Sequence, residues 1–284
     1  MKKVLLPTDF SENSWNAICY AQHLLKEEQC EFHILHTYTP TFYRLDYMMG
    51  GPAYSAIPDM GVEVAQAGLE KTMIDIKNNF DNPKHSFKTF SAFNTPVNEI
   101  IELTTTKKFD LIVMGTQGAT GAKEIFLGSH TVHVIRKSTT PVLAIPEGYA
   151  FKELKSVLFS TDYLDAYQEK NLEILSALIH LHKAKLTVLH VKEEYELTDE
   201  QEANKKTLIS YLTKLNPDVI EERGKLMPNA VQDYIEEHQS GLLAMMNKKH
   251  SFFERLRNKQ NLDTIGFHTK IPLLVMPETA EIKK

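Results

Sequence analysis

Three glycines and a serine in the first half of the chain have the types and spacing of a phosphate-binding site. Gly115 ends the short apolar run Leu111–Met114, Gly118 comes three residues later, and the pair Gly128-Ser129 precedes an expected helix. Because glycine has no Cβ atom, its backbone N–H group can approach a bound group closely. Ser129 is a suitable N-cap, and the free N–H groups at the start of a helix favour an anion. We therefore predict that this stretch binds phosphate.

Glycine is also common in turns, so each glycine has a plainer interpretation in which it only shapes the connection between a strand and a helix. The combined spacing, G-x2-G-x9-G-S, favours the phosphate interpretation. Two other phosphate motifs are absent from the sequence, which has neither the G-x4-G-K-[ST] of a P-loop nor a G-x-G-x-x-G after a strand.

Short apolar runs alternate with helical patterns through the first half of the chain. We expect Ser11 to cap the first helix and residues 39–61, which are rich in Pro, Tyr and Met, to form a long loop. Strands alternating with helices are typical of a parallel sheet covered by helices. The expected strands are residues 4–6, 32–37, 87–93, 111–114 and 141–145, and the later helices are 62–80, 97–105 and 130–137.

Ligands of such sheets bind beyond the carboxyl ends of the strands, where the strand order reverses. Asp9 follows the first expected strand, Thr37 ends the second and Gly115 follows the fourth, so the three should lie at one rim. Asp9 is equally well explained as a turn former before the first helix, and the sequence leaves both roles open. Lys123, between the glycine clusters, is an auxiliary candidate for contacting a phosphate.

The second half of the chain repeats the pattern of the first. We therefore expect two domains, residues 1–148 and residues 152–284. His36 and His190 occupy equivalent positions, which suits a structural role in the second strand of each unit. The aligned segments are Val4–Phe10 with Val157–Tyr163, Leu35–Thr37 with Leu189–Val191, and Pro141–Glu147 with Pro272–Glu278.

The glycine motif and the repeat resemble those of the universal stress protein family, in a tandem two-domain form. The resemblance implies an α/β fold of two Rossmann-like domains, similar to adenine nucleotide alpha hydrolase-like domains. Each domain would be a five-stranded parallel sheet with helices on both faces. In this family the fifth strands commonly mediate dimerisation, so we expect the two halves to form a pseudo-dimer within the chain. Whether a homodimer also forms is left open.

The resemblance further implies that the first domain binds ATP, with Mg²⁺ accompanying the phosphates. It assigns Asp9 and Thr37 to the adenosine and the glycine motif to the ribose and phosphates. The full expected set is Pro7, Asp9, Thr37, Met114, Gly115, Gly118, Gly128, Ser129, His130 and Thr131.

The glycine motif is degenerate in the second half. Gly115 and Gly118 align with Asn247 and His250, and Gly128-Ser129 aligns with Lys259-Gln260. Side chains replace hydrogen atoms where close backbone approach is needed. We therefore predict that the second domain does not bind ATP in the family's manner, although Asp162 is retained.

The net charge and the apolar runs of the chain limit the classes of partner that we expect. The net charge of −5 without a basic stretch argues against nucleic acid, and no apolar run reaches the roughly 18 residues of a membrane span. The N-terminal apolar run is too short for a signal peptide, and Cys19 and Cys30 are interpreted as ordinary thiols, so we expect a cytoplasmic protein. His130 and His133 share a helix face, but with no acidic or thiol neighbour they do not predict a metal site.

The function expected from the sequence is that of a stress-response or regulatory protein that binds an adenine nucleotide. No general base can be named, so the chain is not expected to be an enzyme. Two alternatives remain: a protein-interaction module with a vestigial nucleotide site, and a slow ATPase.

Overall fold

The computed structural model describes residues 1–38, 60–116, 128–164, 166–192, 196–247 and 270–278. In the first half, strands and helices alternate along the chain. They are β1 (Lys2–Pro7), α1 (Glu12–Leu24), β2 (Cys30–Tyr38), α3 (Met60–Asn79), β3 (His85–Phe93), α4 (Pro96–Thr106), β4 (Leu111–Gly115), α5 (Ser129–Lys137) and β5 (Val142–Ile145).

The second half follows the same order, with two short 3₁₀ helices in addition. Its elements are β6 (Ser156–Thr161), η1 (Glu169–Leu172), α6 (Glu173–His182), β7 (Lys185–Lys192), α7 (Asp199–Leu212), η2 (Thr213–Leu215), β8 (Asp218–Arg223), α8 (Met227–His238), β9 (Leu242–Asn247) and β10 (Leu273–Pro277).

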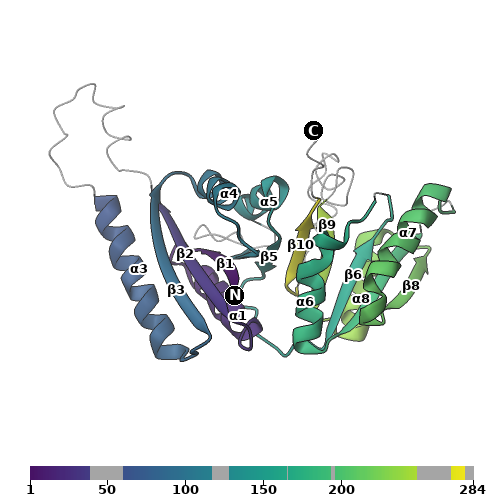
Figure 1. The fold of residues 1–284 in the computed structure, drawn as a ribbon, viewed down its shortest axis with the longest axis horizontal. Coiled ribbons are helices and arrows are strands. Elements are labelled where there is room, and N and C mark those ends of the chain that lie inside the picture. Colours follow the sequence, from purple (N-terminus) through teal and green to yellow (C-terminus); the bar gives the residue numbers. More distant parts are fainter. Residues whose placement is uncertain (39–59, 117–127, 165, 193–195, 248–269, 279–284) are drawn as a thin grey trace, which may run out of the picture.

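The strands of both halves join in one 10-stranded sheet with the order β3-β2-β1-β4-β5-β10-β9-β6-β7-β8. Strands pair in parallel within each half, whereas β5 and β10 pair antiparallel, with Leu143 opposite Leu274. Figure 1 shows β5 and β10 side by side in the middle of the molecule, with β3 and β8 at the two ends of the sheet. The expected pairing of the two halves through their fifth strands is therefore present in the structure.

Helices cover both faces of the sheet because side chains alternate along each strand. In β1, Val4 and Leu6 enter the core beneath α1 and α3, while Leu5 enters the opposite core beneath α4 and α5. In the second half, α6 and α7 cover the first of these faces and α8 covers the second. The continuous apolar runs of the sequence thus correspond to strands that are buried on both sides.

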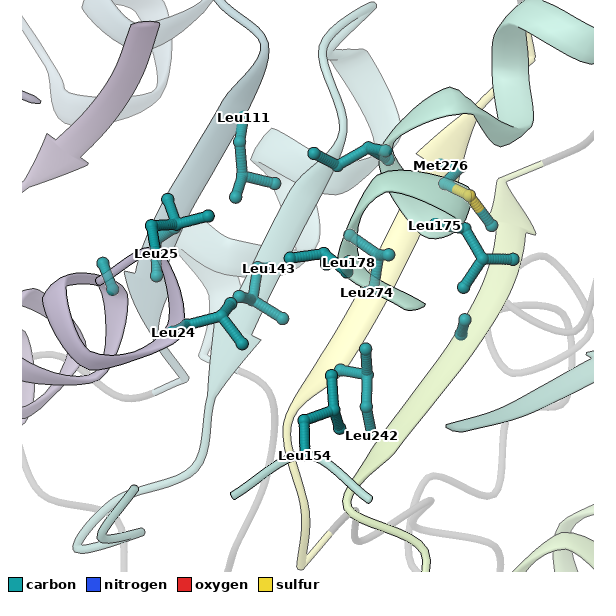
Figure 2. Packing of buried hydrophobic residues seen from close by; sticks show 14 of the residues in the cluster. Leu24, Leu25, Leu111, Leu143, Leu154, Leu175, Leu178, Leu242, Leu274 and Met276 are labelled. Carbon is teal, nitrogen blue, oxygen red and sulfur yellow. The ribbon is translucent and has the colours of Figure 1, made fainter. Parts of the chain in front are cut away.

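The two halves share one hydrophobic core across β5 and β10. Leu24 and Leu143 of the first half belong to the same buried cluster as Leu178 and Leu274 of the second, as Figure 2 shows. Polar contacts reinforce this joint: His182 Nε2 lies 2.8 Å from Leu24 O, and Asn16 Nδ2 donates to Tyr149 O (3.2 Å) in the connecting segment.

Two expectations about local structure were wrong. Ser129 is not the N-cap of α5, because Val132 N donates to Gly128 O (3.0 Å) and so closes the first turn on Gly128. Met60 and Gly61, placed in a loop, begin α3, since the apolar stripe from Val62 onward marks the buried face of a helix but not its first turn. Residues 39–59, the rest of that expected loop, lie outside the described residues.

Candidate functional site

A cavity of about 360 Å³ opens at the carboxyl ends of β1, β2 and β4. It lies where the strand order reverses, because β2 and β3 follow on one side of β1 and β4 and β5 on the other. Nine of the ten residues expected at the site line it, and Gly118 lies outside the described residues. The nine are Pro7, Asp9, Thr37, Met114, Gly115, Gly128, Ser129, His130 and Thr131.

The turn after β1 forms one wall of the cavity. Phe10 has a φ of 64°, an unusual value for a residue with a bulky side chain. Thr8 Oγ1 supports this turn by accepting from Phe10 N (3.0 Å), and it lies 2.9 Å from Ser14 Oγ. Asp9 Oδ1 accepts from Ser11 N (3.1 Å) and from Ser11 Oγ (2.5 Å). The turn-forming role considered for Asp9 is therefore present, and Asp9 also lines the cavity.

His36, at the end of β2, was not among the residues expected to bind ligand, yet it lines the cavity. Its Nδ1 lies 2.8 Å from Thr8 O, and its ring stacks on Phe10 with centroids 4.1 Å apart. The second half repeats this arrangement, because His190 Nδ1 lies 3.0 Å from Thr161 O and Tyr163 has a φ of 56°. These contacts agree with the structural role expected for the two histidines.

Gly115 ends β4 and lines the cavity, and close packing also constrains this position. A Cβ atom at this position would lie 2.5 Å from Asn13 Nδ2, on the adjacent helix α1. The end of β4 also anchors the start of α5, because Thr131 Oγ1 donates to Gly115 O (2.9 Å) and Gly128 N donates to Thr116 O. The glycine that was interpreted as a phosphate-binding residue therefore has a structural role as well.

The first turn of α5 is the most suitable part of the cavity for an anion. The N–H groups of Ser129, His130 and Thr131 belong to the first turn, where no carbonyl of the same helix lies one turn earlier to accept from them. Arg136 and Lys137 occupy the last turn, where positive charge complements the helix dipole. The end that faces the cavity is thus the positive end of the helix.

Few ionisable groups line the cavity. Asp9, His36 and His130 are its titratable residues, and neither lysine nor arginine occurs among the described residues that line it. Within the same described part of the chain, no group of three or more His, Cys, Asp or Glu side chains is arranged to hold a metal ion. Asp9 is therefore the one described carboxylate that could accompany a phosphate-bound Mg²⁺.

The residue that replaces Gly115 in the second half has a different function. Asn247 ends β9, and its Nδ2 donates to Ile135 O (2.7 Å) in the last turn of α5, across the boundary between the halves. The other replacements, at 250, 259 and 260, lie outside the described residues. The position that aligns with Gly115, a predicted ligand-binding glycine, thus carries a contact between the two halves.

Comparison with known proteins agrees with this fold. The model of the universal stress protein family matches residues 1–146, so the chain belongs to the universal stress protein family. Universal stress protein MJ0531 of Methanocaldococcus jannaschii is 33% identical over 147 residues, which are 51% of this chain and 81% of that protein. Universal stress protein YxiE of Bacillus subtilis is 33% identical over 146 residues, 50% of this chain and 97% of that protein.

The likeness in structure extends over both halves. The crystal structure of a universal stress protein from Archaeoglobus fulgidus covers 98% of this chain and is itself covered to 98%, with 21% identity and a TM-score of 0.63. At this identity the likeness shows the shared fold, that of a tandem pair. Among the described residues, no helix is both long and apolar enough to cross a membrane.

Proposed function

We propose that this protein binds ATP, or a related adenine nucleotide, in the cavity of its first half and acts as a regulatory module in the cytoplasm. The observation that carries the proposal is the positive end of α5, whose first-turn residues line a cavity at the switch point of the sheet and whose N–H groups have no acceptor within the helix. Membership of the universal stress protein family supports the adenine part of the proposal. The free thiols of Cys19 and Cys30 suit a reducing compartment.

The proposal divides the chain into a binding domain, residues 1–148, and a second domain, residues 152–284, that supports it without a nucleotide of its own. It is a proposal of binding and not of turnover. Asp9 and His36, two of the three titratable residues that line the cavity, are held by hydrogen bonds to the turn after β1. If Mg²⁺ accompanies the nucleotide, the phosphates would supply most of its ligands, with Asp9 the nearest protein carboxylate.

Removing one N–H group of α5 tests the proposal. Ser129 is the first helical residue, where proline is well tolerated, and Gly128 before it has an extended ψ of 148° that suits a following proline. Ser129→Pro therefore deletes an N–H group while keeping the helix. Ser129→Ala is the matched control, because it removes the hydroxyl group and leaves the N–H group in place.

Calorimetric titration with ATP and Mg²⁺ should give one site per chain. A hydrogen bond to a charged partner contributes about 1.5–3 kcal/mol, so Ser129→Pro should weaken binding by about tenfold to a hundredfold. Ser129→Ala should bind within a few-fold of wild type, with circular dichroism confirming that both variants fold. Equal binding by all three proteins, or none at millimolar ATP, would reject the proposed site. Two sites per chain would show that the second domain also binds.

A further inference from the structure

The cavity has one ionisable side chain placed directly at the positive end of α5. His130 is the second residue of this helix, it lines the cavity, and it is exposed to solvent. His133 lies one turn further along the same helix and is also exposed, but the cavity lining described here does not include it. The chain therefore offers two similar exposed histidines on one helix, of which His130 lines the candidate site.

We infer, in an argument that rests on the proposed function, that His130 is the specificity-determining residue of this cavity. Its protonated ring binds the nucleotide's phosphate. The site therefore selects phosphorylated ligands and takes up a proton when one binds. No lysine or arginine occurs among the described lining residues, and Lys123, the lysine considered from the sequence, lies outside the described residues. A protonated histidine is the side-chain cation that the described part of the wall can supply. Histidine is also the side chain that ordinarily changes its charge near neutral pH.

The helix dipole makes this protonation depend on the ligand. A cation at the start of a helix is unfavourable, because it lies beside the partial positive charge of the free N–H groups. A bound phosphate reverses this, since its negative charge lies next to both the N–H groups and the imidazole ring. One proton then passes from solution to the ring, and the resulting N–H group donates to a phosphate oxygen.

The other described residues that line the cavity do not replace His130 in this role. From the turn after β1 comes Asp9, whose Oδ1 accepts twice from Ser11 and whose negative charge repels a phosphate. From β2 comes His36, whose Nδ1 is occupied by Thr8 O and whose ring stacks on Phe10. Helix α4 contributes Pro96 and Ile100, and β4 contributes Met114 and Gly115, none of which carries a charge.

The test compares wild type, His130→Gln and His133→Gln by calorimetric titration with ATP and with adenosine, at about pH 6 and about pH 8. Terminal phosphates themselves titrate near pH 6, so the informative quantity is the ratio of wild-type to variant affinity at each pH. For His130→Gln and ATP, the ratio should be about threefold to tenfold at the lower pH and close to one at the higher pH. Adenosine should give a ratio near one throughout.

Proton uptake supplies a second readout. Titrations in buffers of different ionisation enthalpy should show wild type taking up more protons with ATP than His130→Gln does, while His133→Gln behaves as wild type. A His130→Gln ratio that does not change with pH, or an equal loss in His133→Gln, would overturn the inference while the nucleotide site stands. If wild type binds neither ATP nor adenosine, the proposed function fails first, and the inference with it.

Discussion

Gly115 shows how a single residue can serve packing and binding together. Its missing side chain leaves room for Asn13, and its carbonyl accepts from Thr131, so the position is constrained even without a ligand. The backbone of Gly115 has no positive φ, which leaves the clash with Asn13 as the main obstacle to a larger residue.

We therefore expect Gly115→Ala to lower the free energy of unfolding by about 1–3 kcal/mol, the usual cost of overpacking. In an Asn13→Ala background the same substitution should cost less, because the clashing amide is gone. Urea unfolding of the two single variants and the double variant measures this coupling. An equal cost in both backgrounds would show that Asn13 is not what excludes a side chain at this position.

Glu31 is a buried carboxylate at the start of β2 and does not line the candidate cavity. Its Oε2 lies 2.8 Å from Lys88 Nζ, and its Oε1 lies 2.6 Å from His33 Nε2. The hydrogen bonds from Lys88 and His33 lower the pKa of Glu31 to about 2. Because the folded protein holds this carboxylate ionised, its stabilising effect is complete above the ordinary glutamate pKa and is lost as pH falls towards 2.

Glu31→Gln should accordingly lower the unfolding free energy by about 2 kcal/mol near neutral pH. The difference from wild type should shrink between about pH 4 and pH 2, as the wild-type carboxylate becomes protonated. Glu27→Gln is the matched control, because Glu27 pairs with Lys84 at the surface, where such pairs contribute little. Denaturant unfolding at several pH values tests this, and a gap that stays constant into acid would contradict it.

The residues missed by the sequence are those whose positions depend on the turn after β1. The glycines and Ser129 could be proposed from their spacing, and Asp9 and Thr37 from the ends of expected strands. His36, Thr8 and Ser14 line the cavity around this turn, where Phe10 adopts a left-handed conformation and stacks its ring on His36. No local pattern signals that conformation, since a phenylalanine rarely adopts it.

At the scale of elements, α5 connects the cavity to the second half. Its first turn is anchored to β4 by Thr131, and its last turn accepts a hydrogen bond from Asn247. The sequence predicted this helix from its periodicity but placed its cap one residue late. Both Gly128 and Ser129 are acceptable caps, so only the position of the first closed turn separates them.

Strands were the most predictable elements, because a parallel sheet covered on both faces requires short continuous apolar runs. Such runs marked β1, β2, β4 and β5 in the first half, while β3 was found although its side chains are more exposed. Edge strands such as β3 bury less surface, so their apolar signal is weaker. The apolar runs could not predict the geometry of the turns that line the cavity.

At the scale of the molecule, the family resemblance implied that the fifth strands would meet, but the details of that joint depend on contacts distant in sequence. Asn247 illustrates this: aligned with Gly115, it marked a lost binding site, and only the structure shows that it donates to α5 of the other half. The shared core has the same origin, since leucines from α1 and α6 become neighbours only after β5 and β10 pair.

This shared core should make the two halves unfold together. Leu274 of β10 is fully buried in the cluster that spans both halves, so Leu274→Ala should cost about 2–5 kcal/mol. Trp15, the single tryptophan, lies in α1 of the first half and packs against the same cluster. Its fluorescence should therefore report the loss of stability, and Leu274→Ala should shift the unfolding midpoint measured by fluorescence as much as the midpoint measured by far-ultraviolet circular dichroism of the whole chain.

Val219→Ala, on the exposed edge strand β8, serves as the control and should shift neither midpoint appreciably. A Trp15 transition that stays at the wild-type midpoint in Leu274→Ala would mean that the halves are independent folding units that only touch.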